Sequence, residues 1–188
     1  MRGPAKRRWG GALGLLSTLA AACSGSRERS RPGMTDVAFE VGLGQRVFSG
    51  STQKGHIRET VGQGACWIDH DGDGDLDLFL PNGARQMLAS YEPGDPRLAP
   101  WRLYENVGGR FVDQRAALGP PATAWGVGCA VGDVDADGRD DLYVTAAAGG
   151  SRLLRNVGGT FVDASGPSGT RIGAFTTSAL FFDREGDA

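Results

Sequence analysis

The chain has 188 residues, of which 40% are apolar, 22% are charged and 31 are glycine, and its formal net charge is -2 at pH 7. The apolar share is enough for a buried core, which excludes a wholly disordered chain, and the glycine content favours turns between short strands over a helix bundle. Without residues 1–22, which carry four basic and no acidic side chains, the net charge becomes -6, so nucleic acid is not an expected partner.

Residues 1–22 have the pattern of an export signal. Basic residues precede the apolar run 9–22, which is too short for a stable membrane anchor. Residues 19–23 resemble a bacterial lipoprotein cleavage site, which implies that Cys23 is lipidated and becomes the new N-terminus. A plain secretory cut near Ala22 is the alternative. Residues 23–33 are polar and basic and predict a flexible tether, so we expect an exported protein that is either secreted or held in the cell envelope only through Cys23.

The remaining region, residues 34–188, contains internal repeats. Residues 103–113 and 153–163 align with a shift of 50, and both contain Asn-Val-Gly-Gly, which predicts a tight hairpin turn. A shift of 64 carries Asp69 onto Asp133, and residues 85–100 are interpreted as a loop inserted between two strands. Short segments rich in β-formers and bounded by glycine predict strands at 65–68, 76–80, 110–112 and 142–145. We therefore predict an all-β fold built from β-propeller blades of four antiparallel strands, with about two to three blades in this chain.

Two nine-residue windows hold ten of the 16 aspartates and predict metal loops. Both follow D-x-D-x-D-G-x-x-D and then Leu, and five clustered carboxylates repel one another unless a cation neutralises them. Ca²⁺ is the expected ion because it accepts about six to eight oxygen ligands. The expected ligands are the side chains of Asp69, Asp71, Asp73 and Asp77 with the carbonyl of Asp75, and the side chains of Asp133, Asp135, Asp137 and Asp141 with the carbonyl of Arg139. The carboxylates of Asp75 and Asp140 are expected to point outward.

A calcium loop fits these windows better than a metal-free turn, a different metal or an EF-hand. A metal-free Asp-Gly turn is the plain structural alternative, but the pattern occurs twice at the same position of the repeat. Mg²⁺ is disfavoured because so many protein oxygens leave little room for its waters, and Zn²⁺ because no His or Cys cluster is present. An EF-hand requires Glu at the twelfth position, where Leu80 and Val144 stand.

The order of strand, D-x-D-x-D-G-x-x-D-L, strand and Asn-x-Gly-Gly-x-Phe resembles the FG-GAP/VCBS repeat of integrin-type β-propellers. Residues 34–43 are similar to the start of the bacterial cartilage-acidic-protein-like members of that family. The resemblance implies a propeller with a calcium ion in the loop between two strands of a blade, and it implies no particular ligand.

Residues 181–188 begin a third copy of the loop. Asp183, Glu185 and Asp187 stand at its first three ligand positions, and the sequence ends before a fourth. We expect these residues to contribute to a third metal loop in a longer protein or in an assembly of copies. The alternative is a degenerate last repeat in a small stable domain.

The remaining reactive or aromatic residues indicate no catalytic centre. We find no G-x-S-x-G elbow, no phosphate loop and no nucleophile paired with histidine, so an enzyme is not expected. His70 is expected to be solvated. Cys66 and Cys129 are expected to be buried free thiols, with a disulfide as the alternative.

Three tryptophans leave a choice between packing and recognition. Trp67, Trp101 and Trp125 are expected in the core or between blades rather than stacked on a ligand. The expected function is a calcium-stabilised, non-catalytic binding or adhesion module for a protein or polysaccharide. The alternatives are the N-terminal propeller of a larger secreted enzyme and a purely structural envelope protein.

Overall fold

The computed structural model describes residues 33–50, 53–83, 101–119 and 124–184. The predicted signal 1–22, Cys23, the tether up to residue 32, and the ligand candidates Glu185 and Asp187 lie outside these residues. The chain divides into two units, 1–36 and 37–188, and all strands belong to the second unit. No helix among the described residues has the length and apolar character needed to cross a membrane.

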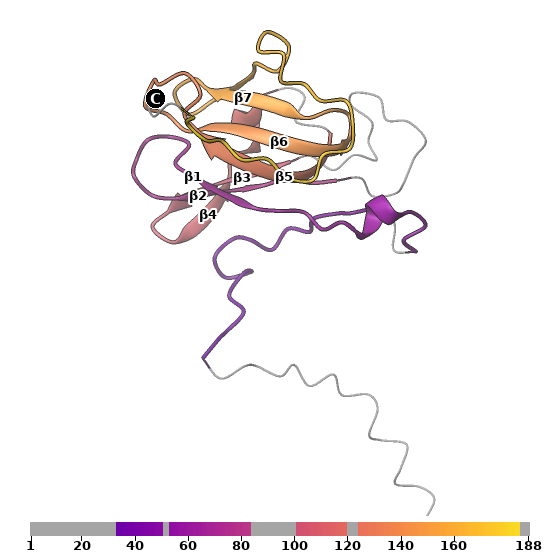
Figure 1. Ribbon diagram of the computed structural model, residues 1–188. Coiled ribbons are helices and arrows are strands. Elements are labelled where there is room, and N and C mark those ends of the chain that lie inside the picture. Colours follow the sequence, from indigo (N-terminus) through magenta and orange to yellow (C-terminus); the bar gives the residue numbers. More distant parts are fainter. Residues whose placement is uncertain (1–32, 51–52, 84–100, 120–123, 185–188) are drawn as a thin grey trace, which may run out of the picture. The chain divides into compact units, whose positions relative to one another are not determined.

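The second unit contains two four-stranded antiparallel sheets in which the strands follow one another in chain order (Figure 1). The first sheet consists of β1 (Cys66–Ile68), β2 (Asp77–Leu80), β3 (Arg102–Val107) and β4 (Arg110–Asp113). The second consists of β5 (Trp125–Gly132), β6 (Asp141–Ala148), β7 (Arg152–Asn156) and β8 (Phe161–Asp163). Two short 3₁₀ turns, η1 (Ile57–Thr60) and η2 (Arg115–Leu118), are the only helical elements of the described residues. The all-β prediction is confirmed, and the two sheets are consistent with a partial β-propeller.

The two sheets are copies of one unit. Leu78 pairs with Tyr104 in the first sheet, and Leu142 pairs with Leu154 at the corresponding position of the second. The segment 85–100, predicted as a loop inserted between two strands, lies outside the described residues, between β2 and β3 in the sequence. The sequence periods of 64 and 50 therefore reflect a repeated β-meander.

Each repeat closes with the predicted hairpin turn. Gly108 and Gly109 adopt φ of 60° and 87° between β3 and β4, a conformation that residues with a side chain rarely adopt. The side-chain oxygen of Asn106 accepts a hydrogen bond from the backbone N–H of Gly109 at 2.8 Å. Asn156 and Gly159 repeat this contact at 2.9 Å between β7 and β8. The Asn-Val-Gly-Gly motif thus sets both turns.

The sheets stack so that opposite faces of the repeat meet. We call the face that carries Leu142, Val144 and Leu154 in the second sheet the A face, and the opposite side of each sheet the B face. One buried cluster joins these A-face residues to Ile68, Phe79 and Leu103 of the first sheet. The last two correspond to Tyr143 and Leu153, which lie on the B face of the second sheet. The B face of one repeat therefore packs on the A face of the next.

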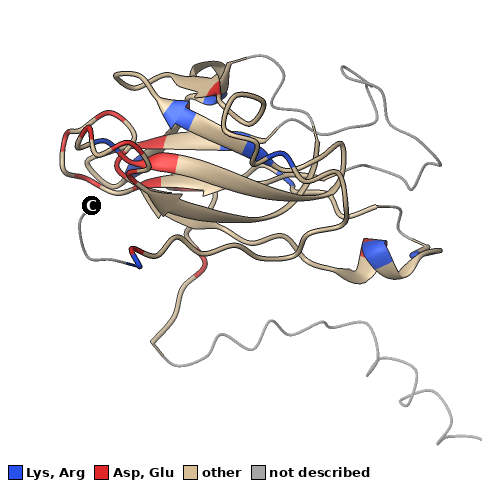
Figure 2. Cartoon of the chain, turned by 45° about the horizontal axis from the view of Figure 1, so that its top comes forward, with Lys and Arg blue, Asp and Glu red and all other residues tan. Residues whose placement is uncertain are grey.

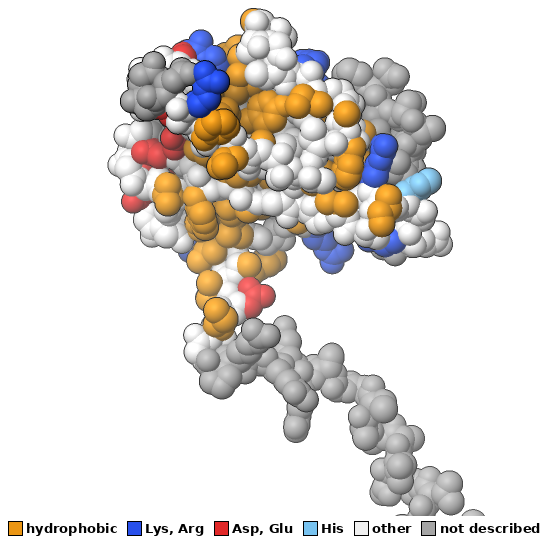
Figure 3. Space-filling view, viewed as in Figure 1, with side chains coloured by type: hydrophobic (Ala, Val, Ile, Leu, Met, Phe, Trp, Pro, Cys, Tyr) orange, Lys and Arg blue, Asp and Glu red, His pale blue; other side chains and the backbone are white. Residues whose placement is uncertain are grey.

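Chain outside the strands contacts the β4 edge of the first sheet and the outer face of the second. The backbone of Phe111 in β4 donates a hydrogen bond to the carbonyl of Val41 at 2.7 Å. On the B face of the second sheet, residues 168–181 border a partly open pocket of about 520 Å³ that is lined by Tyr143, Leu153 and Phe181 among others. Figure 3 shows hydrophobic side chains over the face that this segment crosses. The described residues 164–184 contain no strand.

An ion pair recurs at the same position in both repeats. Arg102 pairs with Asp113 at 3.0 Å, and Arg152 pairs with Asp163 at 3.3 Å. Partial burial works to raise the pKa of Asp163, but hydrogen bonds from Ser165 and the nearby guanidinium groups outweigh it and hold the pKa below its usual value. The Arg152–Asp163 pair therefore connects β7 to β8 at neutral pH, and the Arg102–Asp113 pair connects β3 to β4.

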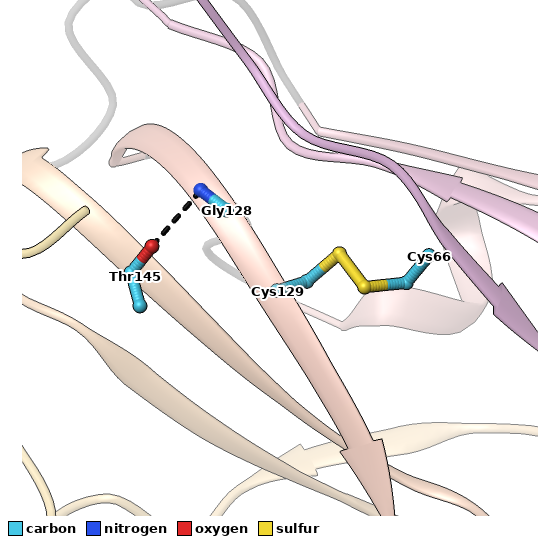
Figure 4. The surroundings of a disulfide bond; sticks show 4 residues. All are labelled: Cys66, Gly128, Cys129 and Thr145. Atoms are coloured by element: carbon cyan, nitrogen blue, oxygen red, sulfur yellow. Dashed lines mark hydrogen bonds between the residues drawn. A yellow bond between two sulfur atoms is a disulfide. The ribbon is translucent and has the colours of Figure 1, made fainter. Parts of the chain in front are cut away.

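The prediction of free thiols is wrong, because Cys66 and Cys129 form a disulfide between β1 and β5 (Figure 4). Their Cα atoms lie 6.1 Å apart. Cys66 stands three residues before the first aspartate of its loop, whereas Cys129 stands four residues before its own. This offset of one residue places them on opposite faces of equivalent strands, and those faces meet in the stack. The backbone N–H of Gly64, just before β1, also donates a hydrogen bond to the carbonyl of Val127 in β5 at 2.6 Å.

The tryptophans divide between core and surface. Trp101 and Trp125 are each 1% exposed, which confirms that they are packing residues. Trp67 is 55% exposed and lies 6.1 Å from Phe111, measured between ring centroids. The expectation of burial is therefore wrong for Trp67, whose equivalent in the second repeat, Val131, packs against the core.

Candidate functional site: two aspartate loops

The two aspartate-rich windows form loops at equivalent places in the repeats. Residues 69–76 connect β1 to β2, and residues 133–140 connect β5 to β6. Figure 2 shows that acidic residues gather at one end of the sheets, where these loops lie. Gly72 and Ala136 correspond to each other, and both have positive φ, of 80° and 55°. The loops therefore share a backbone path as well as a sequence pattern.

The first aspartate of each loop organises the backbone that follows it. Asp69 accepts hydrogen bonds from the N–H groups of Gly72 at 2.8 Å and Gly74 at 3.1 Å. Asp133 accepts the bond equivalent to that of Gly74 from Gly138 at 2.7 Å, and a second bond from the N–H of Asp137 at 3.1 Å, one position later than Gly72. These bonds curl the chain around the first carboxylate, so the later acids of the loop return toward it.

The last aspartate of each motif lies at the base of the loop. Asp77 is 1% exposed and Asp141 is 0% exposed. Asp141 accepts the backbone N–H of Val134 at 3.0 Å through one oxygen and that of Asn156 at 2.8 Å through the other. Asp77 accepts the N–H of His70 at 3.0 Å and of Asn106 at 2.8 Å in the same way. Each of these carboxylates therefore fastens its loop to the hairpin of its own repeat.

The role of the two asparagines was not predicted from the sequence. Besides binding the buried aspartate, Asn106 donates its side-chain amide to the carbonyl of Leu76 at 3.2 Å, within its own repeat. Asn156 instead donates its amide to the carbonyl of His70 at 2.8 Å, in the preceding repeat. The occurrence of Asn at the same place in both hairpins was the available signal, but it was interpreted only as a turn preference.

The prediction that His70 is solvated is wrong. His70 is 4% exposed, and its Nδ1 lies 2.5 Å from a carboxylate oxygen of Asp77. The bend at the start of the loop directs this side chain inward, where the buried carboxylate is its partner. Val134 occupies the corresponding position in the second loop, so this contact is specific to the first repeat.

The structure brings together part of each predicted ligand set. Oxygen atoms of Asp69, Asp71 and Asp73 lie within 4.8 Å of one another in the first loop. In the second loop the group consists of Asp133, Asp135 and Asp141. Asp77 falls in a different group, with His70 and Asp71, and Asp137 falls in none. Asp183 of the third copy is exposed.

The two loops also touch each other. Asp140 was expected to point outward, but its carboxylate accepts the backbone N–H of Asp69 at 3.2 Å, so that expectation is wrong. A polar cavity of about 150 Å³ lies between the loops and is lined by residues of both, including His70 and Arg139. Asp75 is exposed, as expected. Asp140 is directed inward because the stacking of the repeats places the second loop beside the start of the first.

Two arginines neutralise carboxylates of the second loop. Arg155 on β7 forms an ion pair with Asp135 and lies 3.7 Å from Asp137. Arg139 pairs with Asp137 and donates its Nε–H to the carbonyl of Asn156 at 3.1 Å. The guanidinium of Arg155 is thus a cation held against the carboxylates of the second loop.

The chemistry of both loops fits Ca²⁺. Their donors are hard oxygens, and three carboxylates converge in each loop. Arg155 stands in for a cation at the second loop, which indicates that these carboxylates take up positive charge where it is available. The carbonyls of Asp75 and Arg139 would complete the sets named from the sequence.

Comparison with protein families finds an FG-GAP-like repeat at residues 69–144. This region begins at the first aspartate of the first loop and ends in β6, so it includes both aspartate loops. Curated proteins and solved structures give no match to the chain. The repeat indicates a module of the propeller or adhesion type.

Proposed function

We propose that this chain is an exported, calcium-stabilised β-propeller module that binds a protein or polysaccharide and carries out no catalysis. The observation that supports it best is the equivalent placement of two aspartate loops, each with three carboxylates within 4.8 Å. Carboxylates gathered in this way at one end of the sheets repel one another, and a divalent ion removes that cost.

Calcium acts in this proposal as a structural clamp. Asp77 and Asp141 connect the loops to the hairpins through buried hydrogen bonds, so an ion held by the loop also fixes the hairpin beneath it. Because the ion binds only the folded loop, calcium stabilises the fold by mass action. The carboxylates serve as ligands, and none is assigned the role of a catalytic base.

Export is supported by two independent features. Residues 1–22 have the pattern of a signal peptide, and Cys23 follows small residues as in a lipoprotein. The disulfide between Cys66 and Cys129 adds a structural argument, because such bonds form and persist mainly in oxidising compartments. We propose that the mature protein is secreted or held at the envelope through a lipid on Cys23.

The binding role is supported by the repeat and by one partly exposed aromatic pair. FG-GAP-like repeats indicate an adhesion-type module, and residues 34–43 favour the bacterial cartilage-acidic-protein-like group within that class. Trp67 and Phe111 lie side by side, and Trp67 is more than half exposed. Aromatic surfaces of this kind stack on sugar rings or on protein side chains, so we propose a protein or polysaccharide as the partner.

The calcium proposal is tested by titrating the chelator-treated chain while following binding heat and melting temperature. We expect saturable heat and a higher melting temperature with millimolar Ca²⁺, and a smaller rise with Mg²⁺ at the same concentration. The double variant Asp71→Asn/Asp135→Asn should lose most of the response, because each substitution removes one charged ligand. Glu40→Gln removes one exposed acid outside the loops and should respond like the unmodified chain.

Two outcomes would overturn the proposal. Absence of both heat and thermal shift with Ca²⁺ in the unmodified chain would remove calcium from the function. An undiminished response in the double variant would show that the ion binds elsewhere.

A further inference from the structure

The two aspartate loops have the same ligand pattern, but charged residues at two positions next to the ligands differ in sign. At the seventh position of the motif the first loop has Asp75 and the second has Arg139. On the third strand of each repeat, Glu105 in the first corresponds to Arg155 in the second. Both exchanges replace a negative charge by a positive one, and together they outweigh the opposite exchange at the eighth position, where Leu76 corresponds to Asp140, so the second loop lies in a less negative environment.

The positive charges of the second loop are in contact with its acids. Arg155 pairs with Asp135, a predicted ligand, and lies 3.7 Å from Asp137, while Arg139 pairs with Asp137. Among the described residues, no lysine or arginine forms an ion pair with an aspartate of the first loop, and Asp77 instead contacts the imidazole of His70. The first loop therefore has no cation of its own in this part of the chain.

We propose that Arg155, assisted by Arg139, is a built-in counterion of the second loop that competes with calcium. The first loop is then the tight, calcium-dependent site, and the second is a weaker site that stays ordered without the ion. This inference rests on the proposed function, because it concerns how the two loops share the same ion.

Electrostatics gives the direction and size of the effect. A divalent ion at the second loop must displace Arg155 from Asp135 or bind close to its positive charge. When about 6 Å of water separates the calcium ion from the guanidinium of Arg155, their repulsion weakens calcium binding roughly tenfold. Salt screens the repulsion and reduces the effect to about threefold. Removal of the Arg155 charge should strengthen calcium binding at the second loop by the same factor, whether the ion displaces Arg155 or binds beside it.

The inference is tested by isothermal titration of the chelator-treated full chain with CaCl₂ at low ionic strength. We expect two classes of site whose dissociation constants differ by at least about tenfold. Asp71→Asn should remove the tight class, and Asp135→Asn should remove the weak class, which assigns each class to a loop. Arg155→Gln should tighten the weak class about three- to tenfold and leave the tight class unchanged.

Arg115→Gln is the matched control for the loss of one surface charge. Arg115 is also a partly exposed arginine in an ion pair, 3.5 Å from Asp113, but it does not contact either loop. Its variant should leave both dissociation constants unchanged, within the error of the titration.

Hydrogen exchange in EGTA gives a readout that does not depend on bound calcium. The backbone amides of residues 133–140 should exchange more slowly than those of residues 69–76, and Arg155→Gln should abolish this difference.

Three results have distinct meanings. No calcium heat in the unmodified chain would overturn the proposed function itself. Binding at two sites with equal affinity, or a tighter second loop, would overturn only the inference about Arg155. Unchanged or weaker binding in Arg155→Gln, in a variant that still melts cooperatively, would likewise overturn it.

Discussion

Asp141 has a different role from its neighbours in the sequence motif. It is completely buried, and both of its oxygens accept backbone N–H groups, from Val134 and Asn156. The motif predicts it only as a ligand, because a pattern of letters does not indicate which acid lies beneath the loop. Burial of His70 was missed for the same reason, since its partner Asp77 is seven residues away in the sequence.

Substitution of Asp141 tests this anchoring role. Asp141→Asn places an amide group against a backbone N–H, so a donor faces a donor in a buried site. We expect the free energy of unfolding in calcium-free buffer to fall by about 2–3 kcal/mol. Asp73→Asn, in an exposed part of the first loop, should change it by less than about 0.5 kcal/mol. Urea denaturation followed by tryptophan fluorescence measures the free energy of unfolding of both variants. An equal decrease in the two would contradict the anchoring role of Asp141.

At the level of elements, the hairpins and loops were the most predictable parts of the fold. Asn-Val-Gly-Gly and D-x-D-x-D-G encode local backbone conformations, so a single sequence is sufficient to locate them. The pairing of faces between sheets depends instead on contacts between residues far apart in the chain. This explains why the Cys66–Cys129 bond was not predicted: an offset of one residue had to be combined with knowledge of which faces meet.

The hairpin turn provides a prediction at this scale. Gly109 has φ of 87°, and a Cβ added there would meet no atom within 4 Å, so only backbone strain opposes a side chain. Gly109→Ala should therefore lower the free energy of unfolding by roughly 1–2 kcal/mol. Gly166 has equally open surroundings and no positive φ, so Gly166→Ala should have little effect. Chemical denaturation measures the free energy of unfolding of both variants. An equal decrease in the two would show that backbone strain is not the cause.

For the whole molecule, the disulfide connects the two repeats where they begin. It joins residues separated by 63 positions, and closing a loop of this size removes much of the entropy of the unfolded chain. The double variant Cys66→Ser/Cys129→Ser should lose about 2–4 kcal/mol of unfolding free energy. The unmodified chain with its disulfide reduced should have the same free energy of unfolding as the double variant. Agreement would show that the loss of the bond, and not the change of side chain, causes the decrease. Equal stability of oxidised and reduced protein would contradict the prediction.

The same bond decides how the molecule responds when it is pulled. A force applied along the chain on either side of this region enters at Cys66 and leaves through Cys129, so the polypeptide between the two sulfurs bears no load. With a separation of 63 residues, about 220 Å of contour length stays hidden until a reductant cuts the bond. An adhesive protein with this construction would extend in two stages, and the second stage would depend on the redox state of its surroundings rather than on force alone.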